Sequence, residues 1–136
     1  MQIQPYLHFN GNCQEAFKLY EKCLGGKIEA MMTMGEAPAE AKIPAGSGNQ
    51  IMHACLKVGD AVLMASDACG QPYTAPQGFS VSIQINDPAK AERIFNELSE
   101  GGKVTMPIAQ TFWAYRFGML VDRFNIPWMI NCEKPA

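Results

Sequence analysis

The chain has few charged side chains and no excess of basic ones. Charged residues make up 18% of the 136 positions, with 11 Lys and Arg against 13 Asp and Glu and a formal net charge of −2. Proteins that bind nucleic acids usually carry a basic excess or a basic stripe, so we expect no nucleic-acid partner. Hydrophobic residues make up 48%, which is typical of a soluble protein with a large interior or a buried interface.

Long apolar runs and export signals are also lacking. No run approaches the roughly 18 apolar residues of a transmembrane helix, and residues 1–5 have neither the basic nor the apolar region of a secretion signal. Five cysteines form no C-x-x-C pair: Cys13, Cys23, Cys55, Cys69 and Cys132. We therefore expect a cytoplasmic protein with free thiols and no membrane partner. Cys13 and Cys23 are expected to be buried beside a helix.

What the sequence does contain is a series of short apolar strands and two capped helices. Asn12 is a good N-cap for a helix over 12–24, and Asp87-Pro88 begins a second helix over 87–99. Each helix ends at a Gly-Gly pair, and Gly59-Asp60 predicts a hairpin turn. The predicted strands are 5–9, 27–34, 50–58, 61–66, 79–85, 103–106, 115–121 and 126–131.

The order of these elements repeats, and the repeat predicts the architecture. The segment 24–28, Leu-Gly-Gly-Lys-Ile, recurs at 100–104 as Glu-Gly-Gly-Lys-Val. Strand, helix and three strands follow one another in both halves. We predict an α+β fold of duplicated βαβββ modules whose mixed sheets curve into a cup. Module one covers 1–67, a linker 68–78 and module two 79–134 of a single domain.

The first strand of each module indicates which side faces its helix. Leu7 and Phe9 alternate with Gln4, Tyr6 and His8, so the apolar pair is expected under the helix and the polar side chains on the open face. In the second module the apolar set is Val81, Ile83 and Ile85, and the opposite set is Ser80, Ser82 and Gln84. The predicted cup is therefore lined by polar groups.

The duplicated order resembles the vicinal oxygen chelate superfamily, which includes glyoxalase I, extradiol dioxygenases, and bleomycin- and fosfomycin-resistance proteins. Several motifs are similar to its PhnB-like branch: residues 5–11, 52–54, 63–67, Thr111-Phe112-Trp113-Ala114, Phe117-Gly118-Met119 and Trp128-Met129-Ile130-Asn131. The resemblance covers essentially the whole chain and implies the glyoxalase/bleomycin resistance/dihydroxybiphenyl dioxygenase fold. Sequences of this branch carry the description demethylubiquinone methyltransferase, but no glycine-rich loop for S-adenosylmethionine follows a strand here.

The superfamily's usual chemistry uses a divalent metal held by one side chain from the first and last strand of each module. Carried over position by position, these side chains are Gln4, Met64, Ser80 and Met129. Two thioethers and a hydroxyl are poor ligands for hard or borderline divalent ions. We therefore expect no metal at this site and no other cofactor.

Two histidines are the candidates for acid-base or anchoring chemistry. Met52 and Ala54 belong to an apolar alternation that leaves His53 on the opposite, concave side, together with His8. An imidazole that titrates near neutrality can act as a general base or anchor a ligand, although each histidine could instead be a hydrogen-bonded structural residue. Ser66 on the neighbouring strand could contact His53. No nucleophile elbow supports a Ser-His-Asp triad.

Further pocket candidates come from the aromatic, basic and thioether side chains. Trp113 could line a ligand pocket or a dimer interface, whereas Trp128 is expected in the core. Arg116 could grip a carboxylate or phosphonate or lie in solvent, and Met129 could pack against an apolar ligand. With Tyr6, His8, His53 and Ser66, these residues are the predicted ligand contacts. The Pro- and Gly-rich loop 35–49 is the predicted lid.

Three classes of function remain open from the sequence. The first, which we favour, is a homodimer that binds an unidentified small molecule in the cup without metal. The second is a metal-dependent lyase, isomerase or dioxygenase whose non-standard site uses His8, His53 and Gln4. The third is a structural or regulatory dimer with a vestigial pocket. The sequence alone does not decide whether the protein is an enzyme.

Overall fold

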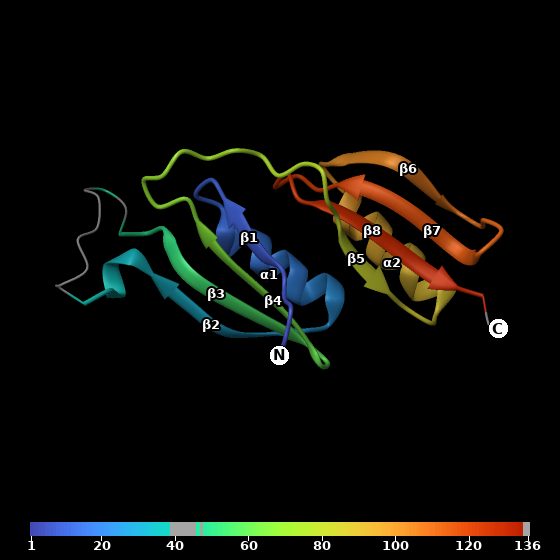
Figure 1. Ribbon diagram of the computed structural model, residues 1–136, viewed down its shortest axis with the longest axis horizontal. Helices are drawn as coiled ribbons and strands as arrows, with labels where there is room; N and C mark the ends of the chain where they lie inside the picture. Colours follow the sequence, from blue (N-terminus) through green and yellow to red (C-terminus); the bar gives the residue numbers. More distant parts are fainter. Residues whose placement is uncertain (39–45, 47, 135–136) are drawn as a thin grey trace. The chain divides into compact units, whose positions relative to one another are not determined.

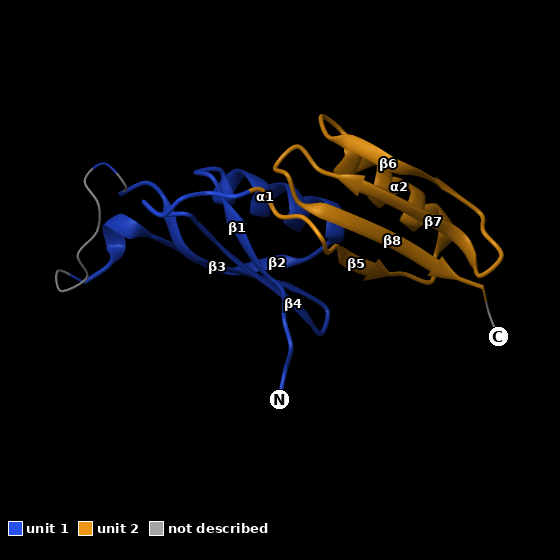
Figure 2. Cartoon of the chain, turned by 45° about the horizontal axis from the view of Figure 1, so that its top comes forward, with its two compact units in different colours: residues 1–74 blue, residues 75–136 orange. Residues whose placement is uncertain are grey.

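Each half of the chain forms a four-stranded mixed sheet with one helix on one of its faces (Figure 1). The computed structural model describes residues 1–38, 46 and 48–134. Contacts divide the chain into two units, residues 1–74 and 75–136 (Figure 2). The boundary falls inside the predicted linker 68–78. That the two modules form a single domain with a shared cup stays a prediction.

Unit 1 contains one complete βαβββ module. Its elements are β1 (Tyr6–Phe9), α1 (Cys13–Leu24), β2 (Lys27–Thr33), the short 3₁₀ helix η1 (Met34–Glu36), β3 (Ile51–Val58) and β4 (Ala61–Asp67). The strand order is β1-β4-β3-β2, with β1 parallel to β4 and the other neighbours antiparallel. The first and last strands of the module therefore lie side by side.

Unit 2 repeats this plan. Its elements are β5 (Val81–Gln84), α2 (Pro88–Ser99), β6 (Lys103–Ala109), β7 (Ala114–Val121) and β8 (Pro127–Glu133). The order β5-β8-β7-β6 again places the first strand parallel to the last. The predicted α+β fold of duplicated βαβββ modules is confirmed. Strand β6 runs three residues beyond the predicted 103–106, because an edge strand tolerates Pro107.

The helices begin near the predicted residues, but only one uses the predicted cap. Asp87 accepts hydrogen bonds from the backbone N–H groups of Ala89 and Lys90 at the start of α2. Asn12 makes no side-chain cap bond at the start of α1. The carboxylate of Asp67 on β4 accepts the N–H of Cys13 instead, at 3.0 Å. Asn12 therefore occupies the predicted N-cap position, but the N–H at the start of α1 is bonded by a tertiary partner and not by the Asn12 side chain.

The core of unit 1 lies between α1 and the helix-covered face of its sheet. Leu7 and Phe9 are buried there, as their alternation predicts. The Phe9 ring meets Phe17 edge-on at 6.2 Å between centroids and Tyr20 at 6.5 Å. Cys13 and Cys23 are buried in the same layer, as expected. The opposite face of this sheet is therefore the one left for polar side chains.

In unit 2 the helix approaches its sheet closely at one glycine. A Cβ on Gly118 would lie 2.6 Å from Phe95 Cε2, so β7 packs against α2 through bare backbone. Trp128 is 1% exposed, as expected of a core side chain, and its Nε1–H donates to Asp122 at 2.8 Å.

None of the helices among the described residues is long and apolar enough to span a membrane.

Candidate functional site

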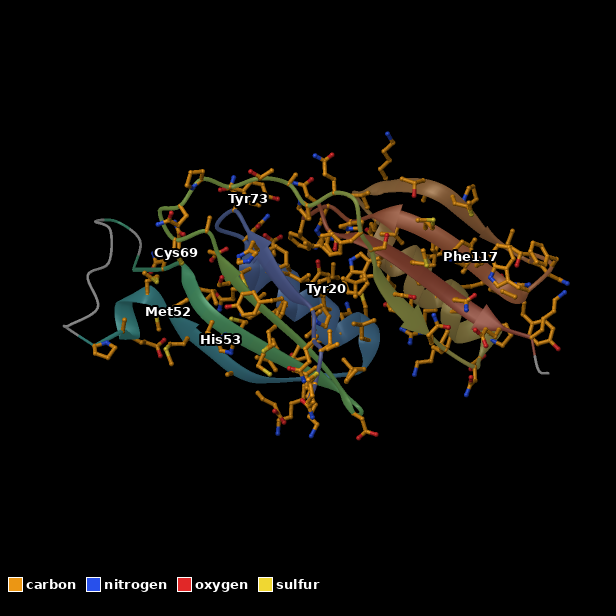
Figure 3. The ribbon with its side chains drawn as sticks, in the orientation of Figure 1. Tyr20, Met52, His53, Cys69, Tyr73 and Phe117 are labelled. Atoms are coloured by element: carbon orange, nitrogen blue, oxygen red, sulfur yellow. The ribbon has the colours of Figure 1, made fainter. Side chains whose placement is uncertain are left out.

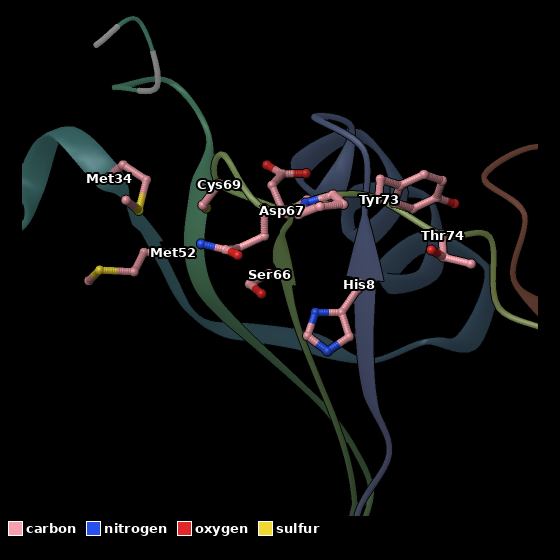
Figure 4. Close-up of a pocket in the computed structure, with 11 residues that line it drawn as sticks. His8, Met34, Met52, Ser66, Asp67, Cys69, Tyr73 and Thr74 are labelled. Carbon is pink, nitrogen blue, oxygen red and sulfur yellow. The ribbon is translucent and has the colours of Figure 1, made fainter. Parts of the chain in front are cut away.

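A cavity of about 650 Å³ lies on unit 1, over the end of the sheet where β1 and β4 finish (Figure 4). Its walls come from β1, η1, β3, β4 and the segment 68–74 that follows β4. The side chains that matter for its chemistry are His8, Met34, Met52, Ser66, Cys69 and Tyr73. All of the wall belongs to unit 1.

His8 and Ser66 supply polar groups from two adjacent strands. They are register partners in the parallel pairing of β1 and β4, so their side chains project from the same face of the sheet. Ser66 is 9% exposed, while His8 is exposed. Both predicted pocket residues line the cavity. An imidazole and a hydroxyl that project side by side from neighbouring strands can both form hydrogen bonds with one ligand, as donors or as acceptors.

Met52 lines the cavity, although its alternation with Ala54 predicts the helix-covered face. The pairing of β2 with β3 passes from Met32 opposite His53 to Thr33 opposite Ile51, so Met52 is an extra residue in β3. Such a bulge breaks the alternation of the strand. Met52 therefore reaches the cavity, and Met34 of η1 lines the same cavity.

Tyr6, His8 and His53 lie together on the open face. The Tyr6 hydroxyl is 3.3 Å from His53 Nδ1, and its ring is 5.3 Å from that of His8 and 5.9 Å from that of His53. His8 lines the cavity, whereas Tyr6 and His53 are not part of its wall. His53, labelled in Figure 3, thus has Tyr6 as its hydrogen-bond partner and not Ser66, the contact that the sequence left possible.

Asp67 lines the cavity and links three segments of unit 1 by hydrogen bonds. Its two oxygens accept the backbone N–H groups of Cys13, at 3.0 Å, and Ile51, at 2.7 Å. Burial, and then the charge of Asp67, raises the pKa of Cys13 to about 12. The same causes raise the pKa of Cys69, whose Sγ–H donates to the Ile51 carbonyl at 3.4 Å. Both thiols are therefore protonated at neutral pH.

The sequence did not indicate Cys69 or Tyr73 as wall residues. Cys69 and Tyr73 belong to a non-repetitive segment in which no periodicity shows the direction of a side chain. The backbone of Cys69 has a positive φ of 52°, but this feature is visible in the structure and not in the sequence. The predicted lid 35–49 includes residues 39–45 and 47, which lie outside the described residues. The residues that flank the predicted lid are joined by a hydrogen bond from the Met34 N–H to the Gln50 carbonyl at 2.8 Å.

The remaining predicted contacts belong to unit 2. Trp113 is 42% exposed and meets the rings of Phe112 and Phe117 at 4.7 and 5.2 Å between centroids. Met129 pairs with Ser82 on one side and with Met119 on the other. Arg116 donates through Nε to Glu92 of α2 at 2.6 Å. Arg116 is thus engaged on the helix side of its sheet.

The two mixed βαβββ units define the vicinal oxygen chelate fold, as the sequence predicted. The fosfomycin resistance protein FosX from Mesorhizobium loti shares it with a TM-score of 0.64 at 10% identity, over 98% of this chain and 92% of that one. The PhnB protein from Bacillus cereus shares it with a TM-score of 0.81 at 20% identity, over 97% and 99%.

The family follows from the sequence comparisons. The sequence model of the family described as 3-demethylubiquinone-9 3-methyltransferase matches residues 1–131, and the chain belongs to this family. Protein YjdN from Escherichia coli K12 is 34% identical over 142 residues, covering 98% of this chain and 97% of that protein. The crystal structure of protein PA1353 from Pseudomonas aeruginosa is 51% identical, with a TM-score of 0.91 and 99% of each chain covered.

The metal that the superfamily implies does not fit the residues present. The carried-over positions offer an amide, a hydroxyl and two thioethers, from Gln4, Ser80, Met64 and Met129. Divalent ions of the hard and borderline kind prefer carboxylate, imidazole and water. Across residues 1–38, 46 and 48–134, no group of three His, Cys, Asp or Glu side chains is placed to hold a metal ion.

Proposed function

We propose that this chain is a PhnB-like protein that binds a small molecule in the cavity on unit 1, without a divalent metal in the superfamily's usual position. The observation that carries the proposal is the convergence of His8 and Ser66 on a cavity of about 650 Å³. Small-molecule sites typically measure roughly 300–1,000 Å³ and combine apolar walls with a few polar groups. This cavity has both features within one unit.

The chemistry of the wall favours a ligand with an apolar body and hydrogen-bonding groups. Met34 and Met52 offer polarizable thioethers that adapt to an irregular shape. No Lys or Arg is among the wall residues, and Asp67 already accepts two backbone N–H groups. A strongly anionic ligand would therefore find no fixed positive charge. Among the polar side chains of the wall, His8 and Ser66 project together from the sheet and orient the ligand. Tyr6 and His53 lie beside His8 on the open face.

Methyl transfer is not part of this proposal. The turn from β1 to α1 is Asn10-Gly11-Asn12, and the turn from β5 to α2 is Ile85-Asn86-Asp87. Neither is the glycine-rich loop, following a strand and opening a helix, that brings a cofactor close to the backbone. We therefore take the family description as evidence of family membership and do not assign methyltransferase activity to this chain on that basis.

A thermal-shift screen followed by affinity measurements tests the proposal. A ligand that binds only the native protein must raise its melting temperature. For the strongest ligand found, His8→Ala and Ser66→Ala should each weaken binding by about 1 kcal/mol or more, because each removes a hydrogen-bonding group. His53→Ala should have a smaller effect, since His53 is not part of the cavity wall.

The matched control is Lys90→Ala on the exposed surface of α2, which should leave affinity unchanged. Unchanged affinity in both His8→Ala and Ser66→Ala would contradict the site. A screen that yields no stabilising ligand would favour the structural or regulatory dimer. Emission spectroscopy of the purified protein tests the metal separately: one Zn, Ni, Mn or Fe per chain, lost on Gln4→Ala, would show that the metal-free site is wrong.

A further inference from the structure

The turn that joins β1 to α1 contains the one Asn-Gly pair of the sequence, Asn10-Gly11. Both residues are exposed. Gly11 has a φ of 88°, in the left-handed region that favours glycine, and a Cβ built on it would meet no atom within 4 Å. The pair therefore lies in solvent, and no neighbouring atoms crowd the side of Gly11 where a side chain would be.

Neither the Asn10 side chain nor the Gly11 N–H is held by a hydrogen bond across residues 1–38, 46 and 48–134. Asn125, in the turn between β7 and β8, is a contrast, because the N–H of the next residue, Ile126, donates to Asp122 at 3.0 Å. Asn96 is another contrast, because it and the residue after it lie inside α2. The backbone after Asn10 thus lacks the hydrogen bonds that hold the backbone after these two asparagines.

An exposed Asn-Gly pair of this kind can modify itself. The Gly11 nitrogen attacks Cγ of the Asn10 side chain, and the new N–Cγ bond closes a five-membered succinimide ring. The bond from Cγ to the side-chain NH2 breaks, and this group leaves as ammonia with the proton that the Gly11 nitrogen gives up through solvent. Water then opens the ring. Attack at Cγ gives aspartate, whereas attack at the backbone carbonyl carbon gives isoaspartate, in which the main chain continues through the former side chain.

The two ends of this turn are held by hydrogen bonds to the end of β4 and the residue after it. The Phe9 carbonyl accepts the N–H of Ala68 at 2.8 Å, and the Cys13 N–H donates to Asp67 at 3.0 Å. Aspartate at position 10 keeps the length of the main chain. Isoaspartate adds one carbon atom to the main chain between these two fixed points, so it should disturb the hydrogen bond at one of them.

We propose that Asn10-Gly11 is a site of spontaneous deamidation in the native protein, and that its isoaspartate product loosens the start of α1. The reaction needs water and no enzyme or cofactor. Both products add one negative charge to the turn. The site lies outside the wall of the unit 1 cavity, so the proposal does not depend on the function proposed for that cavity.

Peptide mass mapping of the full-length protein during incubation at pH 8 tests the site. The peptide that contains Asn10 should gain the mass difference between the water taken up and the ammonia lost. It should do so roughly tenfold faster than the peptides that contain Asn96 or Asn125, because Gly11 has no Cβ to hinder the attacking nitrogen. The reaction should be slower at pH 6, because the attacking nitrogen must lose its proton to base.

Two substitutions at position 10 separate the reaction from its consequence. Asn10→Gln keeps a side-chain amide but should abolish the mass gain, because its longer side chain would have to close a six-membered ring. Asn10→Asp carries the charge of the products on an unaltered main chain and should melt at the temperature of the unmodified protein. The chromatographically purified isoaspartate form should melt at a lower temperature. Asn12→Gln, in the same turn, is the matched control and should leave the rate at Asn10 unchanged.

A mass gain at Asn10 no faster than at Asn96, or one that persists in Asn10→Gln, would overturn the site. An isoaspartate form that melts at the same temperature as the unmodified protein would overturn its effect on α1. These readouts involve no ligand. Failure of His8→Ala and Ser66→Ala to weaken binding would therefore contradict the proposed function and leave the deamidation result unaffected.

Discussion

At the residue scale, Asp67 joins three segments of unit 1 that are distant in sequence. It ends β4, and its carboxylate accepts hydrogen bonds from the first residue of α1 and the first residue of β3. Asp67 is 4% exposed, so both backbone N–H groups depend on it rather than on water. Its role is to position the end of the sheet where His8 and Ser66 meet the cavity.

Asp67→Asn should therefore destabilise the fold by roughly 1–3 kcal/mol, because one oxygen becomes an N–H donor that faces a backbone N–H group. Urea unfolding monitored by circular dichroism measures the change. Asp60→Asn in the exposed β3–β4 hairpin turn is the matched control and should alter the free energy of unfolding by less than about 0.5 kcal/mol. Equal effects of the two substitutions would contradict this role of Asp67.

The buried thiol of Cys13 predicts a loss of stability at high pH. Burial raises its folded-state pKa to about 12 from an ordinary value of 9.0. The unfolded chain therefore loses this proton first, and stability that is fully present below pH 9 declines as the pH rises towards 12. Unfolding at pH 8 and pH 10 should show a loss of roughly 1 kcal/mol, and Cys13→Ala should lack that part of it. An identical pH dependence in the variant would contradict the assignment.

The sequence predicted residue positions well where local alternation determines them. Leu7, Phe9 and Trp128 are buried as expected, and His8 and Ser66 line the cavity. It failed where a tertiary partner replaces a local one. Asn12 stands at the N-cap of α1, but its side chain makes no cap bond and Asp67 accepts the first N–H of the helix. Arg116, a predicted ligand contact, pairs with Glu92 on the helix side. No local pattern records such partners.

At the scale of elements, caps and glycine stops predicted both helices to within a residue, because these signals act over one helical turn. The repeated Gly-Gly-Lys turn predicted the duplication in the same way. The bulge at Met52 was not predicted. One extra residue changes the face of the sheet to which the following side chains point, but it leaves the composition of the strand unchanged. The cavity wall formed by the segment 68–74 has no periodicity from which it could be predicted.

The contact of β7 with α2 predicts that any side chain at Gly118 destabilises the fold. In Gly118→Ala the new Cβ would lie 2.6 Å from Phe95 Cε2 and 2.9 Å from Ile108 Cα, so the helix or strand β6 must move. The expected cost is about 1–3 kcal/mol of unfolding free energy, as for overpacked cores. Gly48→Ala is the control, because its nearest neighbour is the Gly35 Cα at 4.0 Å. A Gly118→Ala protein as stable as the control would contradict the close approach.

At the scale of the whole molecule, we predict a homodimer. A chain with 18% charged and 48% hydrophobic residues has apolar surface to cover, and Phe112 is 89% exposed. Sedimentation equilibrium at micromolar concentration should give twice the 14.9 kDa of one chain. Phe112→Ser should shift the equilibrium towards monomer if this side chain is in the interface. A single species of 14.9 kDa in the unmodified protein would contradict the dimer.

The most direct test of the central claim is the crystal structure of the protein with the strongest ligand from the thermal-shift screen. The unit 1 cavity should contain ligand density within hydrogen-bond distance of His8 and Ser66, against the thioethers of Met34 and Met52. No metal should bridge Gln4 and Met64 to the ligand. A stabilising ligand that leaves this cavity empty, or that reaches the protein through a bound divalent metal, would contradict the account.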